Sequence, residues 1–147
     1  MESRQIHESD GQRTFVVVLA AGDEVSSCLQ RFAEAEGLSA AQVTAIGAFR
    51  RAELAFFDWQ AKEYRPIPVD EQVEVLSING DITLEGQGKR KLHLHAVLGR
   101  ADGSTRGGHL VRGEVRPTLE VIVTESPTHL CRRPDPESGL ALIDPAR

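Results

Sequence analysis

Apolar and polar residues follow two different periods along this chain. Between positions 25 and 36 the apolar side chains recur three and four residues apart, which predicts one amphipathic helix. The residues that share its apolar face are Val25, Cys28, Leu29, Phe32 and Ala33. Asp23 precedes the helix and is expected to cap it by accepting a hydrogen bond from the backbone of Ser26. Gly37 follows the helix, where a left-handed residue commonly ends one.

Most other segments have the composition of strands. The β-branched run Thr14–Ala20 predicts a strand covered on both faces. Further strands are expected at 43–57 with a bend or bulge at Gly47, at 63–67, at 73–85 with a break at Asn79-Gly80, and at 91–99, 106–115 and 118–124. Ser39 to Gln42 has a capping-box pattern and predicts a short second helical turn. The elements together predict an α+β fold, in which one long and one short helix pack on a mainly antiparallel or mixed sheet.

The length of 147 residues fits a single folded domain. Residues 1–12 are polar and are expected to form a flexible N-terminal arm, followed by the domain itself at residues 13–126. Residues 127–147 are rich in proline and are expected to form a tail that packs across the surface of the domain. No run of the sequence approaches the ~18 apolar residues that a membrane span needs, so we expect a cytoplasmic protein with no membrane partner.

The charge of the chain argues against DNA binding through the whole surface. Seventeen basic and 22 acidic residues give a net charge of −5, whereas DNA-binding domains usually carry the opposite sign. The segment Gly86–Arg116 differs, because it contains seven Lys or Arg and two Asp or Glu, a local charge of +5. We interpret this segment as a solvated basic rim in preference to an anion-binding surface.

The candidate chemistry is concentrated between Leu92 and Gly113. His93 and His95 are two residues apart, so on a strand they project from the same face with Cα atoms about 6.5 Å apart. Two imidazoles at that spacing can bind one zinc ion through bonds of about 2.0–2.1 Å. The pattern also arises on half-exposed strands without a metal, so the alternative is a polar strand face that lines a cleft or a subunit seam.

Whether His109 joins the pair depends on how the strands align. A two-residue turn at Asp102-Gly103 places His109 on the opposite face. A three-residue loop, or a bulge at Gly107-Gly108, pairs His109 with His95 or Val97 and brings the three rings together. Three neutral histidines with open positions would suit a zinc ion that polarises a carbonyl or activates water.

Three further residues are candidates for ligand binding or for supporting the metal. Glu120 lies in an apolar run, and if its strand is central the carboxylate needs a partner, either a metal or Arg112. An exposed edge position for Glu120 is equally compatible with the sequence. Glu53 is the second candidate carboxylate. No phosphate-binding loop, dinucleotide fingerprint or nucleophile elbow is present, and no catalytic residue is identified.

Five segments of the chain resemble, in order, the PPC (Plants and Prokaryotes Conserved) domain. They are Phe15–Leu19, Val43–Ala48, Val75–Gly80, His93–Gly99 and Gly107–Leu110. The most specific blocks are H-L-H-x-x-L-G and G-G-H-L. The resemblance implies an α+β fold that usually assembles as a homotrimer. In plants the domain accompanies AT-hook motifs, and bacterial stand-alone members are often named as candidate DNA-binding proteins.

The chain departs from that pattern where DNA is concerned. An AT-hook needs an Arg-Gly-Arg-Pro core, and the nearest fragments are Arg116-Pro117 and Arg132-Arg133-Pro134. The same fold is similar to that of acetolactate decarboxylase, a zinc enzyme whose metal is held by an H-x-H pair and a later histidine. That likeness implies a zinc site at His93, His95 and His109. The enzyme's carboxylates and arginine have no clear counterpart here, so its activity does not carry over.

Three functions are therefore expected from the sequence. The first is a homotrimeric PPC-domain protein that binds a partner or a small-molecule ligand and holds zinc at its three histidines. The second is a zinc-dependent enzyme that acts on a small carbonyl or carboxylate substrate. The third is a DNA-binding or regulatory module.

Overall fold

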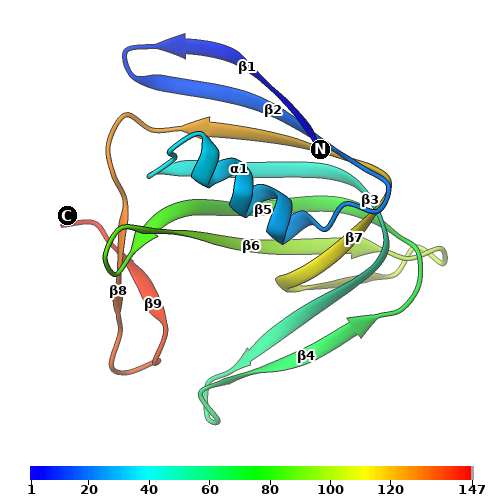
Figure 1. Cartoon of the computed structure of the whole chain (residues 1–147). Helices are drawn as coiled ribbons and strands as arrows, with labels where there is room; N and C mark the ends of the chain where they lie inside the picture. Colours follow the sequence, from blue (N-terminus) through cyan, green and yellow to red (C-terminus); the bar gives the residue numbers. More distant parts are fainter. Residues whose placement is uncertain (147) are drawn as a thin grey trace.

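The computed structural model describes residues 1–146, and these residues form one helix and nine strands (Figure 1). In chain order the elements are β1 (Glu2–Ser9), β2 (Gln12–Ala20), α1 (Val25–Ala35), β3 (Ala41–Asp58), β4 (Glu63–Val69), β5 (Val73–Glu85), β6 (Lys89–Gly99), β7 (Thr105–Glu125), β8 (Cys131–Pro134) and β9 (Ala141–Asp144). The fold is a single α+β domain, as the sequence predicts. Strand predominates over helix more strongly than expected.

All strands belong to one sheet with the order β1-β2-β7-β3-β5-β8-β9, with β4 pairing with β3. Strand β6 pairs with both β5 and β7, so the pairings β7–β3, β3–β5, β5–β6 and β6–β7 close into a ring. Every pairing is antiparallel except that of β5 with β8. The segments expected at 106–115 and 118–124 are parts of the single strand β7.

Helix α1 covers one face of this sheet (Figure 1). Its five predicted apolar residues are all buried, and Phe32 meets Phe15 of β2 edge to face at 5.3 Å. The N-cap is Glu24 rather than Asp23, because the longer carboxylate accepts hydrogen bonds from both Ser26 N and Ser27 N. Gly37 follows with a φ of +69°, as its place in the sequence predicts.

Strand β2 is covered on one face only, which corrects the expectation of burial on both. Phe15, Val17 and Leu19 point into the core under α1, whereas Val18 is exposed. Several apolar side chains of neighbouring strands are exposed in the same way, among them Ile46 of β3 and Ile122 of β7. The apolar run Thr14–Ala20 therefore belongs to a sheet whose outer face is exposed to solvent in the single chain.

Two expected elements have a different structure. Where a loose arm was expected at residues 1–12, Glu2–Ser9 forms β1 and pairs with β2 through a tight turn. Asp10 and Gly11 both have positive φ in that turn, and Asp-Gly is a strong hairpin signal. The short helix expected at Ser39–Gln42 is absent within residues 1–146, because β3 begins at Ala41 and pairs there with β5 and β7. Tertiary pairing has overridden a local capping pattern.

The C-terminal segment is more ordered than the sequence suggests. Instead of an irregular tail, β8 and β9 form a hairpin, and β8 adds to β5 in parallel through Leu84 and Cys131. The hairpin lies next to the turn that connects β5 and β6 (Figure 1). No helix within residues 1–146 has the length and apolar character needed to cross a membrane.

Candidate metal centre

His93 and His95 lie side by side on β6, as the two-residue spacing predicts. Leu94 and Ala96 alternate with them and are buried in the core. The ring centroids of the two histidines are 5.0 Å apart. The strand therefore presents both imidazoles on the face away from the core.

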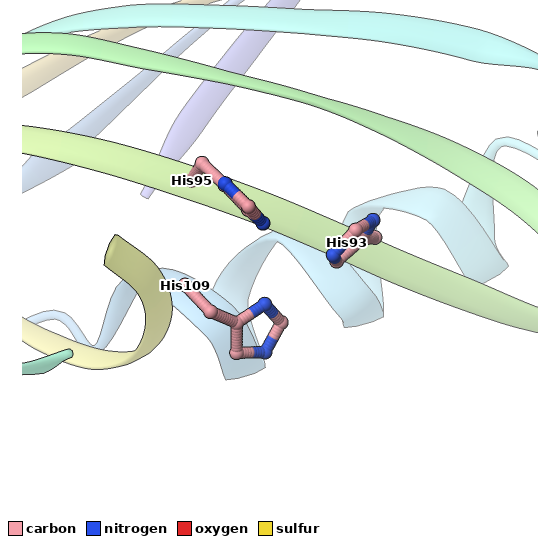
Figure 2. A group of neighbouring side chains, drawn as sticks. All are labelled: His93, His95 and His109. Atoms are coloured by element: carbon pink, nitrogen blue, oxygen red, sulfur yellow. The ribbon is translucent and has the colours of Figure 1, made fainter. Parts of the chain in front are cut away.

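His109 of β7 completes the cluster (Figure 2). It pairs directly with His95 across the β6–β7 ladder, and its ring centroid lies 5.7 Å from that of His95 and 5.1 Å from that of His93. Figure 2 shows the three rings directed toward one another from two strands. The structure thus brings together the three histidines that the sequence predicts as metal ligands.

The alignment is set by the loop between β6 and β7. Arg100 N donates to Ser104 O at 2.9 Å, and Gly103 N donates to Arg100 O at 2.9 Å. The loop is therefore the three-residue type, Ala101–Gly103, with Gly103 at a φ of +80°. Of the alternatives open from the sequence, this loop and not a bulge at Gly107-Gly108 pairs His109 with His95.

The double glycine has another role. A Cβ atom on Gly108 would lie 2.7 Å from the carbonyl oxygen of Ala55 on β3. Because side chains do not tolerate such a distance, Gly108 allows β7 to approach β3 closely. His109 is the next residue, and it pairs with Ala55 on that side. The glycine therefore sets how deeply His109 lies between β3 and β6.

The three imidazoles fit a bound metal ion. One nitrogen from each histidine lies within 4.8 Å of those of the other two. Two zinc–nitrogen bonds span at most about 4.2 Å, so small side-chain rotations bring all three nitrogens to one ion. In addition, His109 Nδ1 is buried and has no hydrogen-bond partner within residues 1–146. A buried nitrogen without a partner is costly, and a metal ion would satisfy it.

The electrostatic environment favours the neutral form of two of the rings, His109 and His93. Burial, followed by the neighbouring His93, His95 and Lys91, lowers the pKa of His109 to about 4. Burial and the charge of Arg132 lower the pKa of His93, although Asp81 acts in the opposite direction. Neutral imidazoles keep the lone pairs that a metal ion needs.

Two neighbours fix the rings from outside. The ring of Tyr64, on β4, stacks against His109 with centroids 4.9 Å apart. Arg132 Nη2, on β8, lies 3.3 Å from His93 Nδ1. In the sequence Arg132 belongs only to an AT-hook-like fragment, and no local pattern marks it as part of this site, since His93 lies 39 residues away.

The other three candidates lie elsewhere. Arg112 forms an ion pair with Glu53 at 2.7 Å, and both line a cavity of about 400 Å³ whose lining residues include no histidine. Glu120 is exposed on the outer face of the sheet, opposite Val18 and Ile46. The strand of Glu120 is central, as one expectation had it, but its carboxylate faces outward.

Comparison with known proteins identifies a family. A model of the Plants and Prokaryotes Conserved (PCC) domain matches residues 6–127. A "putative DNA binding protein" from Bacteroides thetaiotaomicron has a TM-score of 0.88 at 26% identity and covers 99% of both chains. A metal-containing protein from Archaeoglobus fulgidus has a TM-score of 0.83 at 33% identity and covers 95% of this chain and 99% of its own.

Two further likenesses bear on the fold and the context. A Staphylococcus aureus protein of unknown function that is similar to alpha-acetolactate decarboxylase has a TM-score of 0.52 at 15% identity, covering 76% of this chain and 51% of its own, which shows a likeness of fold alone. The bifunctional protein GlmU of Synechococcus sp. (strain JA-3-3Ab) is 32% identical over 130 residues, which are 86% of this chain. The chain spans about a fifth of the length of the curated relatives it matches.

Proposed function

Because the chain belongs to the Plants and Prokaryotes Conserved (PCC) domain family, we propose that it is a member that binds a metal ion and a small ligand, with zinc held by His93, His95 and His109. The observation that carries this proposal is the convergence of three imidazoles whose donor atoms lie within 4.8 Å of one another. His109 Nδ1, which has no hydrogen-bond partner within residues 1–146, supports it. Imidazole is a preferred ligand of zinc, and three protein ligands are typical of sites that leave a position open.

The residues at this site would have different roles. When bound, zinc supplies a Lewis acid that polarises an oxygen of whatever occupies its open position. The histidines hold the ion, while Tyr64 packs against the ring of His109 and Arg132 lies beside that of His93. Such outer contacts keep ligand rings in one orientation.

Metal analysis of the purified protein tests this function. We expect about one zinc ion per chain in the wild type, and loss of zinc in His93→Ala and in His95→Ala. His7→Ala is the matched control, because His7 is exposed on β1, outside the cluster. A wild-type protein that is folded but takes up no metal from zinc-containing buffer would remove the proposal.

We also infer that the chain assembles as a homotrimer. The outer face of the sheet leaves large apolar side chains in solvent, and Ile46 is 60% exposed at its centre. The exposed members of this outer face are Val18, Ile46, Leu76 and Ile122. Monomeric proteins rarely expose contiguous apolar patches of this kind, and copies of the same chain would cover them.

A second candidate is a zinc-dependent enzyme that acts on a small carbonyl or carboxylate compound. The observation that favours it is a cavity beside the histidines whose lining includes His93, His109, Arg132 and Glu85. Incubation of the zinc-loaded protein with small oxo and hydroxy acids, followed by NMR, tests for turnover. Turnover that is lost in His93→Ala would support an enzyme, and its absence across the panel would leave a binding protein.

DNA binding has less support in the side chains themselves. The likeness to a protein named for DNA binding keeps it as a third proposal. However, several basic residues of the segment Gly86–Arg116 are paired with carboxylates, namely Lys91 with Glu85, Arg100 with Glu71 and Arg112 with Glu53. Binding to a DNA duplex at ~50 mM salt that weakens steeply as salt rises would support it. No binding at that salt would dispose of it.

A further inference from the structure

A small cavity lies directly beside the histidine cluster. Its volume is about 230 Å³. The sheet lines it through Glu85 of β5, Lys91 and His93 of β6 and His109 of β7, and the β8–β9 hairpin lines it through residues 139–142. The C-terminal hairpin, which no feature of the sequence assigns to a site, thus encloses the space next to the candidate metal ligands.

One cationic group at the cavity is only weakly paired. Lys91 extends from β6 on the same face as His93, and its side chain is 55% exposed. Its ammonium nitrogen lies 3.8 Å from Glu85, which is beyond hydrogen-bond distance. Lys91 can therefore turn to an anion in the cavity at the loss of only a weak surface ion pair.

Arg132 provides a second, fixed donor. An arginine has five N–H groups. In Arg132 the Nε group donates to Thr83 and Nη1 donates to the carbonyl oxygen of Ala141. Nη2 donates to the carboxylate of Asp81 and contacts His93 Nδ1. One N–H group on Nη1 has no partner within residues 1–146, although the side chain is only 7% exposed. The arginine holds the hairpin in place and keeps one donor for a ligand.

Part of the lining is apolar. Leu140, Ala141 and Leu142 of the hairpin contribute this part. At ~30 Å³ for each water-sized group, the volume holds about eight non-hydrogen atoms, fewer than a typical drug-sized site of ~300–1,000 Å³ accepts. The cavity therefore suits a small molecule with one anionic end and one apolar end.

We propose that this cavity binds a small carboxylate with a short apolar chain. The carboxylate pairs with Lys91 and accepts a hydrogen bond from Arg132, and the chain lies against Leu140 and Leu142. The inference rests on the proposed function, since it assigns the ligand of the same site. A phosphate ion fits less well, because the hairpin wall offers apolar side chains where the phosphate oxygens would need donors.

Calorimetric titration with pentanoate tests the proposal. We expect pentanoate to bind saturably, with one site per chain, and pentylamine of the same length but opposite charge not to bind. Lys91→Gln removes the charge and should weaken binding at least fivefold, whereas Lys89→Gln, a neighbouring exposed lysine outside the cavity, should change it less than twofold. Leu142→Glu places an anion on the apolar wall and should also weaken binding at least fivefold.

Each titration is run on zinc-loaded and on chelator-treated protein, which separates the two proposals. Binding of zinc without saturable binding of pentanoate up to ~10 mM overturns the carboxylate site and leaves the metal site intact. Pentanoate binding that is unchanged in Lys91→Gln and Leu142→Glu also overturns it, because the ligand would then sit on the metal alone. Binding that depends on Lys91 in protein that takes up no zinc supports the carboxylate site and contradicts the metal site.

Discussion

Arg132 Nη2 lies 3.3 Å from His93 Nδ1, although 39 residues separate the two in the chain. The same nitrogen contacts both carboxylate oxygens of Asp81, at 2.8 and 2.9 Å. Because an arginine can only donate, His93 Nδ1 accepts in this arrangement and the proton of the neutral ring is on Nε2. A neutral ring binds zinc through its lone pair and keeps its proton. Zinc must therefore either take the place of Arg132 at Nδ1 or bind at Nε2 after the proton has moved to Nδ1, and in both cases this hydrogen bond is expected to open.

Arg132 is predicted to stabilise the fold as well as the site. Arg132→Met removes the bonds to Thr83 and Ala141 and leaves the carboxylate of Asp81 without its partner in a part-buried position. We expect a loss of about 2–4 kcal/mol in the free energy of unfolding, measured by urea denaturation. Arg4→Met, at an exposed position on β1, should cost less than about 0.5 kcal/mol. Equal effects of the two substitutions would contradict this role for Arg132.

Gly108 is predicted to control the depth of His109. Gly108→Ala places a Cβ atom 2.7 Å from the carbonyl oxygen of Ala55 and should lower the free energy of unfolding by about 1–3 kcal/mol, with weaker zinc binding. Gly107→Ala is the matched control, since its Cβ atom would lie 3.4 Å from the nearest atom, an ordinary contact. Zinc affinity that is the same in both variants would show that β7 does not need this close approach.

The stability of the metal-free protein should depend on pH through His109. Burial, with the charges of His93, His95 and Lys91, lowers its pKa to about 4, below the ~6.5 of an unfolded chain. As pH falls below 6.5 the unfolded chain takes up the proton first, so stability is level above pH 6.5 and is lost toward pH 4. At pH 5 we expect a loss of about 1 kcal/mol from this residue, with allowance for its partial exposure.

Urea denaturation at pH 7 and pH 5 measures that loss. His109→Gln does not titrate in this range, so its stability should fall less between the two pH values than that of the wild type. His7→Gln, which changes an exposed histidine on β1, should fall as much as the wild type. If the wild type and His109→Gln fall by the same amount, His109 does not carry the dependence.

The outer face of the sheet should govern assembly. Ile46→Lys introduces a charge at the centre of the exposed apolar side chains and should convert a trimer to monomers in sedimentation velocity. Val111→Lys changes an apolar side chain that is also exposed but belongs to a bulged part of β7, near α1. That variant should leave the oligomer unchanged. A wild-type protein that sediments as a monomer at ~100 μM would refute the homotrimer outright.

The sequence predicts those features that depend on local periodicity. The spacing of Val25, Cys28, Leu29, Phe32 and Ala33 is enough to identify α1 and its buried face. The two-residue spacing of His93 and His95 is enough to place both rings on one face of β6. The alignment of His109 was left open, because it depends on whether the loop before β7 has two or three residues, and Asp102-Gly103 is compatible with either.

Features that depend on distant pairing could not be predicted in this way. Strand β1 is polar except for Ile6, and backbone hydrogen bonds to the edge of β2 hold it without any apolar pattern. Arg132 reaches His93 only because β8 adds to β5, and neither the prolines nor the short apolar run of the tail indicates that pairing. The ion pair of Arg112 with Glu53, away from the histidines, likewise follows from the β3–β7 register.

The most direct test of the central claim is a crystal structure of the zinc-loaded protein with diffraction recorded on both sides of the zinc absorption edge. We predict one anomalous peak per chain at about 2.0–2.1 Å from a nitrogen of each of His93, His95 and His109. Fully occupied protein with no peak between the three rings, or with a peak bound to one histidine alone, would contradict the account.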